Sequence, residues 1–244
     1  SERGPILLDA QADPARFGDE PCLIRQRTRA SVAVGSDRVA AARLLLEQGV
    51  DVILSDDGLQ HLRLQRDIEI CVIDGQRRFG NGRLLPAGPL REPLTRLAKV
   101  NFRVVNGGDA LTGEIAMRLV AADAWRLNDA QQARPLPSWS GQCVHAVAGI
   151  GHPPRFFASL RDAGMDVIEH GFADHHVYRA SELAFNDGLS VLMTEKDAVK
   201  CADFDVAQAW VVPVQAQLPP GFFEQIVAKL RADKQVPTAP IGVA

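Results

Sequence analysis

The chain has 244 residues and a net charge of −3, and 46% of its residues are hydrophobic. This length suits one large or two modest domains, and this apolar fraction favours a folded core and excludes global disorder. The slight negative charge argues against a general nucleic-acid-binding protein. No apolar run approaches the roughly 18 residues of a membrane span, so we expect any membrane contact of this sequence to be peripheral.

In the first half, short apolar runs alternate with a helical pattern. The apolar runs predict strands at residues 6–8, 32–34, 52–54, 68–73 and 102–105. Residues 37–48 (DRVAAARLLLEQ) predict a helix, because they are rich in Ala and Leu, follow a capping Ser36 or Asp37, and precede Gly49. Strands that alternate with helices predict an α/β fold with a mostly parallel sheet.

A cluster of turn-forming residues at 134–141 (RPLPSWSG) predicts a linker or a domain edge. Beyond it, apolar runs predict strands at 144–147, 167–168, 191–193 and 210–213, and helical patterns cover 153–163 and 221–231. Gly149-Ile150-Gly151 resembles a phosphate-binding glycine loop but lacks the rest of the dinucleotide fingerprint. We therefore expect two domains, residues 1–134 and residues 142–244, of which the second is a smaller α/β domain.

Four cysteines, Cys22, Cys71, Cys143 and Cys201, lie far apart in the sequence and form no C-x-x-C pair. Such spacing is typical of reduced core residues in a cytosolic protein rather than of a disulfide framework or a zinc site.

Two adjacent carboxylates follow the apolar run at 52–54, in the sequence Asp56-Asp57-Gly58. Ligands of parallel sheets bind beyond the carboxyl ends of the strands, and one or two carboxylates with waters and phosphates satisfy Mg²⁺. Asp56 and Asp57 therefore predict a magnesium corner, in which Asp56 is the expected ligand. The alternative is an aspartate that caps the following turn.

A second polar cluster is the sequence HGFADHHVY, which holds His170, Asp174, His175, His176 and Tyr178. These residue types allow a carboxylate–imidazole pair that tunes a base, a divalent-metal site, or an exposed polar turn before a helix that starts near Ser181. Another candidate is Asp19, which Gly18 and Pro21 place on a turn. From the residues alone, Asp19 is equally an N-cap for a helix over 21–26.

Basic residues are concentrated between 77 and 103, where only Glu92 is acidic; they are Arg77, Arg78, Arg83, Arg91, Arg96, Lys99 and Arg103. Such a stretch suits phosphate groups or an anionic membrane surface. The alternative is general composition, since 22 of the 27 basic residues in the chain are Arg.

Several long stretches are distinctive when taken together, namely FGDEPCLIRQRT, VAVGSDRVAAARLLLEQGVDVILSDDGLQHLRLQRD, RRFGNGRLLPAGPLREP, VHAVAGIGHPPRFFASLRDAG, HGFADHHVY and LMTEKDAVKC. These stretches resemble one family, the tetraacyldisaccharide 4'-kinases, which are the lipid A 4'-kinases of Gram-negative bacteria. The resemblance covers nearly the whole chain and implies a sheet of the P-loop kinase type. It also implies transfer of the ATP γ-phosphoryl group to the 4'-hydroxyl of a lipid A disaccharide 1-phosphate, with Mg²⁺. The expected location is peripheral, on the cytoplasmic face of the inner membrane.

The resemblance assigns roles to individual residues. It implies that Asp19 is the catalytic base and that His175 is its partner, although His176 is an alternative register for the partner. Residues expected to bind substrate or phosphate are Glu20, Gln60, His61, Asn81, Arg91 and Glu92. His61 could equally be a core histidine whose hydrogen bonds are satisfied. Lys196 is a candidate phosphate ligand, with a surface ion pair as the alternative.

One departure from the family concerns the P-loop, G-x-x-x-x-G-K-[ST]. None of the lysines (Lys99, Lys196, Lys200, Lys229 and Lys234) follows a glycine, so the 244 residues contain no P-loop. We expect this chain alone, without the family's N-terminal strand and P-loop, to bind ATP poorly and to show little kinase activity. Two alternative functions are a metal-dependent phosphohydrolase that uses Asp56, Asp57, His175 and His176, and a non-catalytic lipid-binding remnant.

Overall fold

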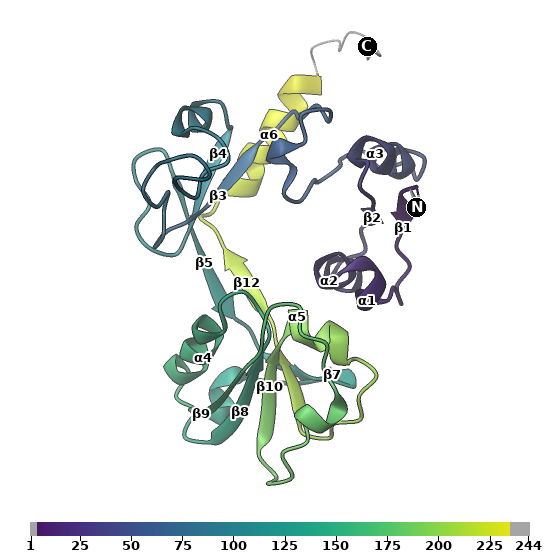
Figure 1. Ribbon diagram of the computed structural model, residues 1–244, viewed down its shortest axis with the longest axis vertical. Coiled ribbons are helices and arrows are strands. Elements are labelled where there is room, and N and C mark those ends of the chain that lie inside the picture. The colour runs from purple at the N-terminus through teal and green to yellow at the C-terminus, as the bar shows by residue number, and fades with distance from the viewer. Residues whose placement is uncertain (1–3, 235–244) are drawn as a thin grey trace. The chain divides into compact units, whose positions relative to one another are not determined.

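The computed structural model describes residues 4–234, which form two compact units (Figure 1). Each unit combines two separate stretches of chain. The first unit contains residues 4–56 and 121–215, and the second contains 57–120 and 216–234. The expected ranges 1–134 and 142–244 divide the chain differently, and their ends at 1–3 and 235–244 lie outside the described residues. The predicted α/β class with mostly parallel sheets is confirmed.

The first unit is built on a six-stranded sheet in the order β7-β6-β11-β10-β8-β9. The strands are β6 (Ala124–Arg126), β7 (Asp129–Arg134), β8 (Cys143–Ala148), β9 (Asp166–Gly171), β10 (Ser190–Thr194) and β11 (Ala209–Val212). The four strands β9, β8, β10 and β11 run parallel to one another, while β6 is antiparallel to β11 and to β7. Strands β8, β10 and β11 are buried almost throughout, which explains their continuous apolar sequences.

The core of this sheet includes residues that the sequence pattern assigns to a linker. Within 134–141, Leu136–Trp139 forms a 3₁₀-helix, and both Leu136 and Trp139 are buried. The Trp139 ring packs edge-on against Trp210, with 5.2 Å between ring centroids. Helix α4 (Pro153–Asp162) begins with two prolines and buries Phe156, Phe157 and Leu160 in the same cluster. The predicted linker at 134–141 is therefore part of the core of the first unit.

The N-terminal part of the first unit contains the helices α1 (Pro14–Phe17), α2 (Asp19–Arg27) and α3 (Arg38–Leu46) and the antiparallel pair β1 (Ile6–Leu7) and β2 (Ala33–Val34). The predicted helix at 37–48 is confirmed as α3, since Asp37 caps it by accepting from the amides of Val39 and Ala40. Leu8, Ala12 and Cys22 form one buried cluster with Val199. The N-terminal helices are thus tied to the later part of the chain.

The strand predicted at 52–54 is wrong, because these residues form no strand in the described structure. Val52 is 50% exposed and Leu54 is 91% exposed. A strand requires a hydrogen-bonded neighbour, and three apolar residues alone do not specify one.

The second unit has a four-stranded sheet in the order β12-β5-β4-β3. Its strands are β3 (Ile70–Asp74), β4 (Phe102–Asn106), β5 (Ile115–Ala121) and β12 (Val214–Gln217), of which β3, β4 and β5 are parallel. Helix α6 (Phe222–Lys234) packs on this sheet through an edge-on contact between Phe222 and Phe102. None of the helices described within residues 4–234 is long and apolar enough to cross a bilayer.

Candidate active site

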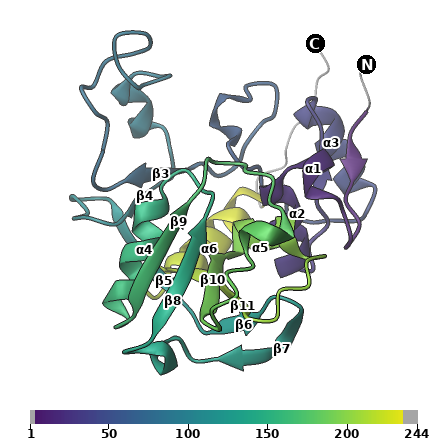
Figure 2. The same cartoon turned by 60° about the horizontal axis from the view of Figure 1, so that its bottom comes forward.

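The candidate site of the first unit lies where three parallel strands end. Strand β8 leads into Gly149, β9 leads into the segment 172–178, and β10 leads into helix α5 (Glu195–Ala198) and the 3₁₀-helix η5 (Val199–Cys201). Carboxyl ends of parallel strands meet at one edge of a sheet, where ligands of α/β proteins bind. Figure 2 shows α5 at the end of β10 with α2 beside it.

Asp19 is the first residue of α2, and Gly18, with φ of +93°, is the N-cap. The alternative in which Asp19 caps a helix over 21–26 is therefore wrong, because the helix begins two residues earlier than the pattern predicts. Asp19 is only 7% exposed. Its place in the first turn of α2 suits an acidic side chain, since the N-terminus of a helix is the positive end of its dipole.

The structure brings His175 onto Asp19. The His175 Nδ1 lies 3.1 Å from Asp19 Oδ2, so an N–H on Nδ1 donates to the carboxylate. His175 has a left-handed backbone (φ +60°), an unusual conformation for a residue other than glycine, and its ring is 66% exposed. The pair therefore joins a buried carboxylate to an imidazole that is open to solvent.

The neighbouring histidines face other partners. His176 stacks on Phe172, and its Nε2 lies 3.2 Å from a carboxylate oxygen of Glu182. The hydrogen bond from the backbone amide of Arg179 is the main cause that lowers the pKa of Glu182, and the hydrogen bond from His176 lowers it further. His170 lies in β9, and its Nε2 is 2.9 Å from Nδ1 of His145. Burial is the main cause that lowers the pKa of His170, and the neighbouring His145 lowers it further. Only His175 of these histidines contacts Asp19 in the described structure.

A buried ion pair lies behind Asp19. Lys200 Nζ is 2.9 Å from Asp197 Oδ1 and 3.7 Å from Asp19 Oδ2. Asp197 has no exposed surface, and its Oδ2 accepts from the Thr194 hydroxyl (2.6 Å) and from the Gly149 amide (3.0 Å). The sequence pattern alone did not single out this pair. The available signal was Thr194-Glu-Lys-Asp197, a capping pattern directly after a predicted strand.

Glu20 and Lys196 form a second ionic group at the surface. Lys196 Nζ lies 3.1 Å from Glu20 Oε1 and 3.2 Å from Asp174 Oδ1. Burial opposes the charge on Lys196, but the bonds to both carboxylates raise its pKa overall. The contacts of Lys196 are therefore those of the surface ion pair, which was the alternative to a phosphate ligand.

Five of the predicted substrate residues belong to the second unit, namely Gln60, His61, Asn81, Arg91 and Glu92. Asn81 shapes its own loop, because its Nδ2 donates to the Ala87 carbonyl (2.8 Å) and its Oδ1 accepts from the Arg83 amide (3.1 Å). Glu92 lies 3.6 Å from Arg96, while Arg91 and Gln60 are exposed and His61 is half-buried.

The chain passes from the first unit to the second between Asp56 and Asp57. Both aspartates are exposed, and Asp57 has a left-handed backbone (φ +48°) before the 3₁₀-helix Gly58–Gln60. Residues 4–234 contain no group of three or more His, Cys, Asp or Glu side chains arranged to hold a metal. The phosphohydrolase alternative requires such a group, whereas a magnesium ion shared with phosphates needs only one or two carboxylates.

The basic stretch 77–103 is partly neutralised. Arg78 pairs with Glu114 at 2.7 Å, and Arg96 pairs with Glu69 at 2.6 Å. Basic residues of this stretch that remain exposed are Arg77, Arg83, Arg91 and Lys99.

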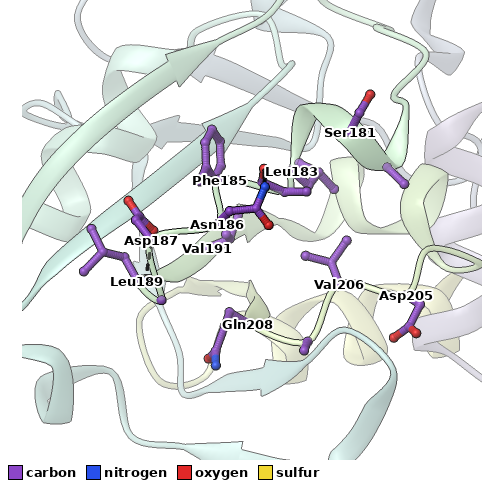
Figure 3. Close-up of a pocket in the computed structure, with 14 residues that line it drawn as sticks. Ser181, Leu183, Phe185, Asn186, Asp187, Leu189, Val191, Asp205, Val206 and Gln208 are labelled. Atoms are coloured by element: carbon purple, nitrogen blue, oxygen red, sulfur yellow. Dashed lines mark hydrogen bonds between the residues drawn. The ribbon is translucent and has the colours of Figure 1, made fainter.

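The first unit also has a cavity of about 370 Å³, which residues from 180–191 and 205–208 line (Figure 3). Asn186 and Asp187 lie on one side of it, and Val206 and Gln208 lie on the other. These segments do not include Asp19 or His175. The candidate site is therefore defined by its side-chain contacts rather than by this cavity.

Comparison with known proteins agrees with the resemblance found in the sequence. A family model for tetraacyldisaccharide-1-P 4'-kinase, LpxK, matches residues 1–231. The tetraacyldisaccharide 4'-kinase of Xanthomonas campestris pv. campestris strain 8004 is 52% identical, over 91% of this chain and 68% of the relative. That of Stenotrophomonas maltophilia strain R551-3 is 49% identical, over 93% of this chain and 69% of the relative.

A solved structure is also similar in fold. It is the "apo" form of LpxK from Aquifex aeolicus in complex with ATP, with a TM-score of 0.75 and 26% sequence identity. The match covers 95% of this chain and 75% of that chain. The chain therefore belongs to the tetraacyldisaccharide 4'-kinase family.

Proposed function

We propose that this protein phosphorylates the 4'-hydroxyl of a lipid A disaccharide 1-phosphate precursor with ATP. The observation that carries the proposal is the contact between Asp19 and His175 at the carboxyl edge of the sheet, in a member of this kinase family. A buried carboxylate paired with an exposed imidazole suits a general base for an alcohol.

In this reaction the 4'-oxygen attacks the γ-phosphorus of ATP, and the bond from that phosphorus to the ADP oxygen breaks. The proton of the hydroxyl passes to Asp19. His175 and Lys200 both contact Oδ2, so Oδ1 is the oxygen that accepts the proton. His175 orients the carboxylate by donating from Nδ1, and its exposed ring leaves the pair open to a substrate.

Mg²⁺ would neutralise charge on the transferring phosphoryl group. Asp56 and Asp57 are the residues that would hold it, and their exposed carboxylates have the oxygen ligands that this ion prefers. The other expected substrate residues, Glu20, Gln60, His61, Asn81, Arg91 and Glu92, provide hydrogen-bonding and charged groups for the sugar and its phosphate.

We further assign the protein to the cytoplasmic face of the inner membrane of a Gram-negative bacterium, as a peripheral protein. The exposed Arg77, Arg83 and Arg91 support this assignment, because arginine binds phosphate oxygens bidentately and anionic lipids attract basic segments.

The test is a transfer assay with ATP, Mg²⁺ and the tetraacyldisaccharide 1-phosphate. Because the 244 residues contain no P-loop, the chain is assayed alone and as a fusion behind an N-terminal P-loop segment of the kind that the family resemblance implies. We expect the fusion to give a product that is heavier by one phosphate at the 4'-position, and Asp19→Asn to abolish most of it. Release of phosphate from the lipid without ATP would instead support the phosphohydrolase.

A further inference from the structure

The buried lysine behind Asp19 has a fixed position. The Lys200 side chain is 9% exposed, and its Nζ contacts carboxylate oxygens of both Asp19 and Asp197. Asp197 is itself held by the hydroxyl of Thr194, the last residue of β10, and by the amide of Gly149, which follows β8. The parallel strands thus fix Asp197, and Asp197 fixes the ammonium.

The ammonium is held by an ion pair, since Lys200 Nζ lies 2.9 Å from Asp197 Oδ1. Within residues 4–234, neither of these two buried atoms has a further hydrogen-bond partner. The Tyr178 ring centroid lies 5.0 Å from Nζ, which adds a cation–π attraction. Burying a charge without saturating its hydrogen bonds costs stability, so a buried lysine of this kind calls for a functional explanation.

The explanation lies in the charge of Asp19. An opposite charge within about 4–6 Å favours the ionised form of a carboxyl group, whereas burial disfavours it. Lys200 is inside that range at 3.7 Å. Other charged or titratable groups around Asp19, from its own helix and from the elements packed against it, are Asp9, Asp13, Glu20, Cys22, Asp174, His175, Lys196 and Asp197. Most of these are acidic, so Lys200 is the buried cation that offsets them.

This inference rests on the proposed function. We propose that Lys200 is a positioning residue for Asp19: its buried ammonium, anchored by Asp197, places a positive charge beside the carboxylate and holds Oδ2 in place beside His175. Oδ1 of Asp19 is thereby left available as the proton acceptor.

The first test needs no kinase activity. The pKa of His175 is measured by NMR of the imidazole ring carbons in the 244-residue chain, and the signal is assigned among the six histidines by its loss in His175→Gln. Lys200→Met should raise this pKa by about one unit, a typical environmental shift. Lys200→Arg should leave it near the wild-type value, because the charge is kept.

Arg27→Met is the matched control. Arg27 lies in the same helix as Asp19, but its Nη1 pairs with Glu195 at 2.8 Å. Its loss should leave the His175 pKa unchanged. An unchanged pKa in a folded Lys200→Met chain, or an equal shift in Arg27→Met, would overturn the proposal.

Lys200→Met leaves Asp197 buried and unpaired, so it can prevent folding. The double variant Lys200→Met/Asp197→Asn removes both charges of the pair, so it should shift the His175 pKa in the same direction as Lys200→Met but by less, because Asp197 lies farther from Asp19 than Lys200 does. If neither variant folds by circular dichroism while Lys200→Arg does, the lysine is a structural residue and the proposal fails.

The second test uses the fusion with the P-loop segment. Removing the cation raises the proton affinity of Asp19, so Lys200→Met should move the acidic limb of the kcat profile to higher pH and lower kcat at neutral pH. KM should change little, and Lys200→Arg should restore the limb. If the fusion is active but the acidic limb of the kcat profile lies at the same pH in Lys200→Met as in the wild type, the proposed role of Lys200 is refuted. An inactive wild-type fusion together with the NMR shift refutes the proposed function and leaves the charge coupling intact.

Discussion

The Nδ1 atom of His175 lies 3.1 Å from Oδ2 of Asp19, although 156 positions of sequence separate the two residues. His175 has a left-handed backbone (φ +60°), while the following His176 contacts Glu182 instead. Two adjacent histidines therefore have different partners.

The first prediction concerns this pair in the fusion that carries a P-loop. Asp19→Asn keeps the shape of the side chain and removes the proton acceptor, so kcat should fall by roughly 10² to 10⁴, the usual contribution of a general base. His175→Ala should lower kcat by the same factor or less. The double variant should be no worse than Asp19→Asn alone, because both residues serve one function. If the losses in kcat of the two single variants multiply in the double variant, Asp19 and His175 act independently. If substitution of His176 lowers kcat and substitution of His175 does not, His176 is the partner of Asp19.

The second prediction concerns the proposed magnesium corner. In the same fusion, Asp56→Ala and Asp57→Ala should both reduce turnover, and the variant that loses the metal ligand should require more Mg²⁺ for half-maximal rate. The comparison variant is Asp51→Ala, which removes an exposed carboxylate from the same segment. Normal turnover and normal Mg²⁺ dependence in both variants would place the metal elsewhere.

The third prediction concerns Gly149, which allows the close approach of Tyr178 and Asp197. A Cβ at this position would lie 2.7 Å from the Tyr178 hydroxyl and 3.1 Å from Asp197 Oδ1. Gly149→Ala should therefore destabilise the first unit by about 1–3 kcal/mol, the usual cost of overpacking. Gly151→Ala is the control, since its Cβ would meet Asp174 Oδ2 at an ordinary 3.7 Å. Urea unfolding followed by tryptophan fluorescence measures both, because all three tryptophans lie in the first unit. Equal effects of the two substitutions would contradict this account.

The fourth prediction concerns the core of the first unit. Leu160 has no exposed surface, so Leu160→Ala leaves a cavity and should cost about 2–5 kcal/mol in the free energy of unfolding. Leu54→Ala should change stability by less than about 0.5 kcal/mol, because Leu54 is 91% exposed. A cost below that of Leu54→Ala would show that α4 is not packed on the sheet as described.

The fifth prediction concerns pH and the second unit. Hydrogen bonds from Arg96 are the main cause that lowers the pKa of Glu69. Burial of the carboxylate opposes this effect, and the hydrogen bond from Arg66 adds to it. A carboxylate whose pKa is lower in the folded state stabilises that state above its unfolded pKa, near 4.3, and loses this contribution as pH falls through the folded pKa. Glu69→Gln should therefore speed amide hydrogen exchange in β3 and β4 at pH 7.

At pH 3 the difference between Glu69→Gln and the wild type should be much smaller, once exchange rates are corrected for pH. Asp67→Asn, at an exposed carboxylate two positions away, is the matched control and should leave exchange unchanged at both pH values. A difference in exchange rate between Glu69→Gln and the wild type that is larger at pH 3 than at pH 7 would contradict the stabilising role of the Glu69 carboxylate.

The local features of the fold could be predicted because the signals lie within a few residues. Asp37 and Gly49 bracket α3 through their backbone preferences, and the buried strands β8, β10 and β11 follow from continuous apolar runs. Strand β7 (DAQQAR) was missed because it is exposed along most of its length and has no apolar pattern. Its position is set by pairing with β6 instead.

The candidate site depended on two kinds of information. The Asp19 and His175 assignments came from the family resemblance, since no periodic pattern connects residues so far apart. The pair of Asp197 and Lys200 was accessible only in three dimensions, because its importance comes from burial and from the distance to Asp19. A lysine in LMTEKDAVK looks like a surface residue until the helix that holds it is packed against α2.

The composition of the first unit from two distant stretches has a consequence during protein synthesis. Residues 4–56 leave the ribosome well before residues 121–215, so Leu8, Ala12 and Cys22 have no Val199 to pack against until almost the whole unit has been made. Closing so long a loop is slow, because its entropy is lost before the contacts form. A nascent chain that stops before residue 175 carries the Asp19 carboxylate without its histidine or its lysine. Premature termination therefore yields fragments in which the proposed base is never assembled.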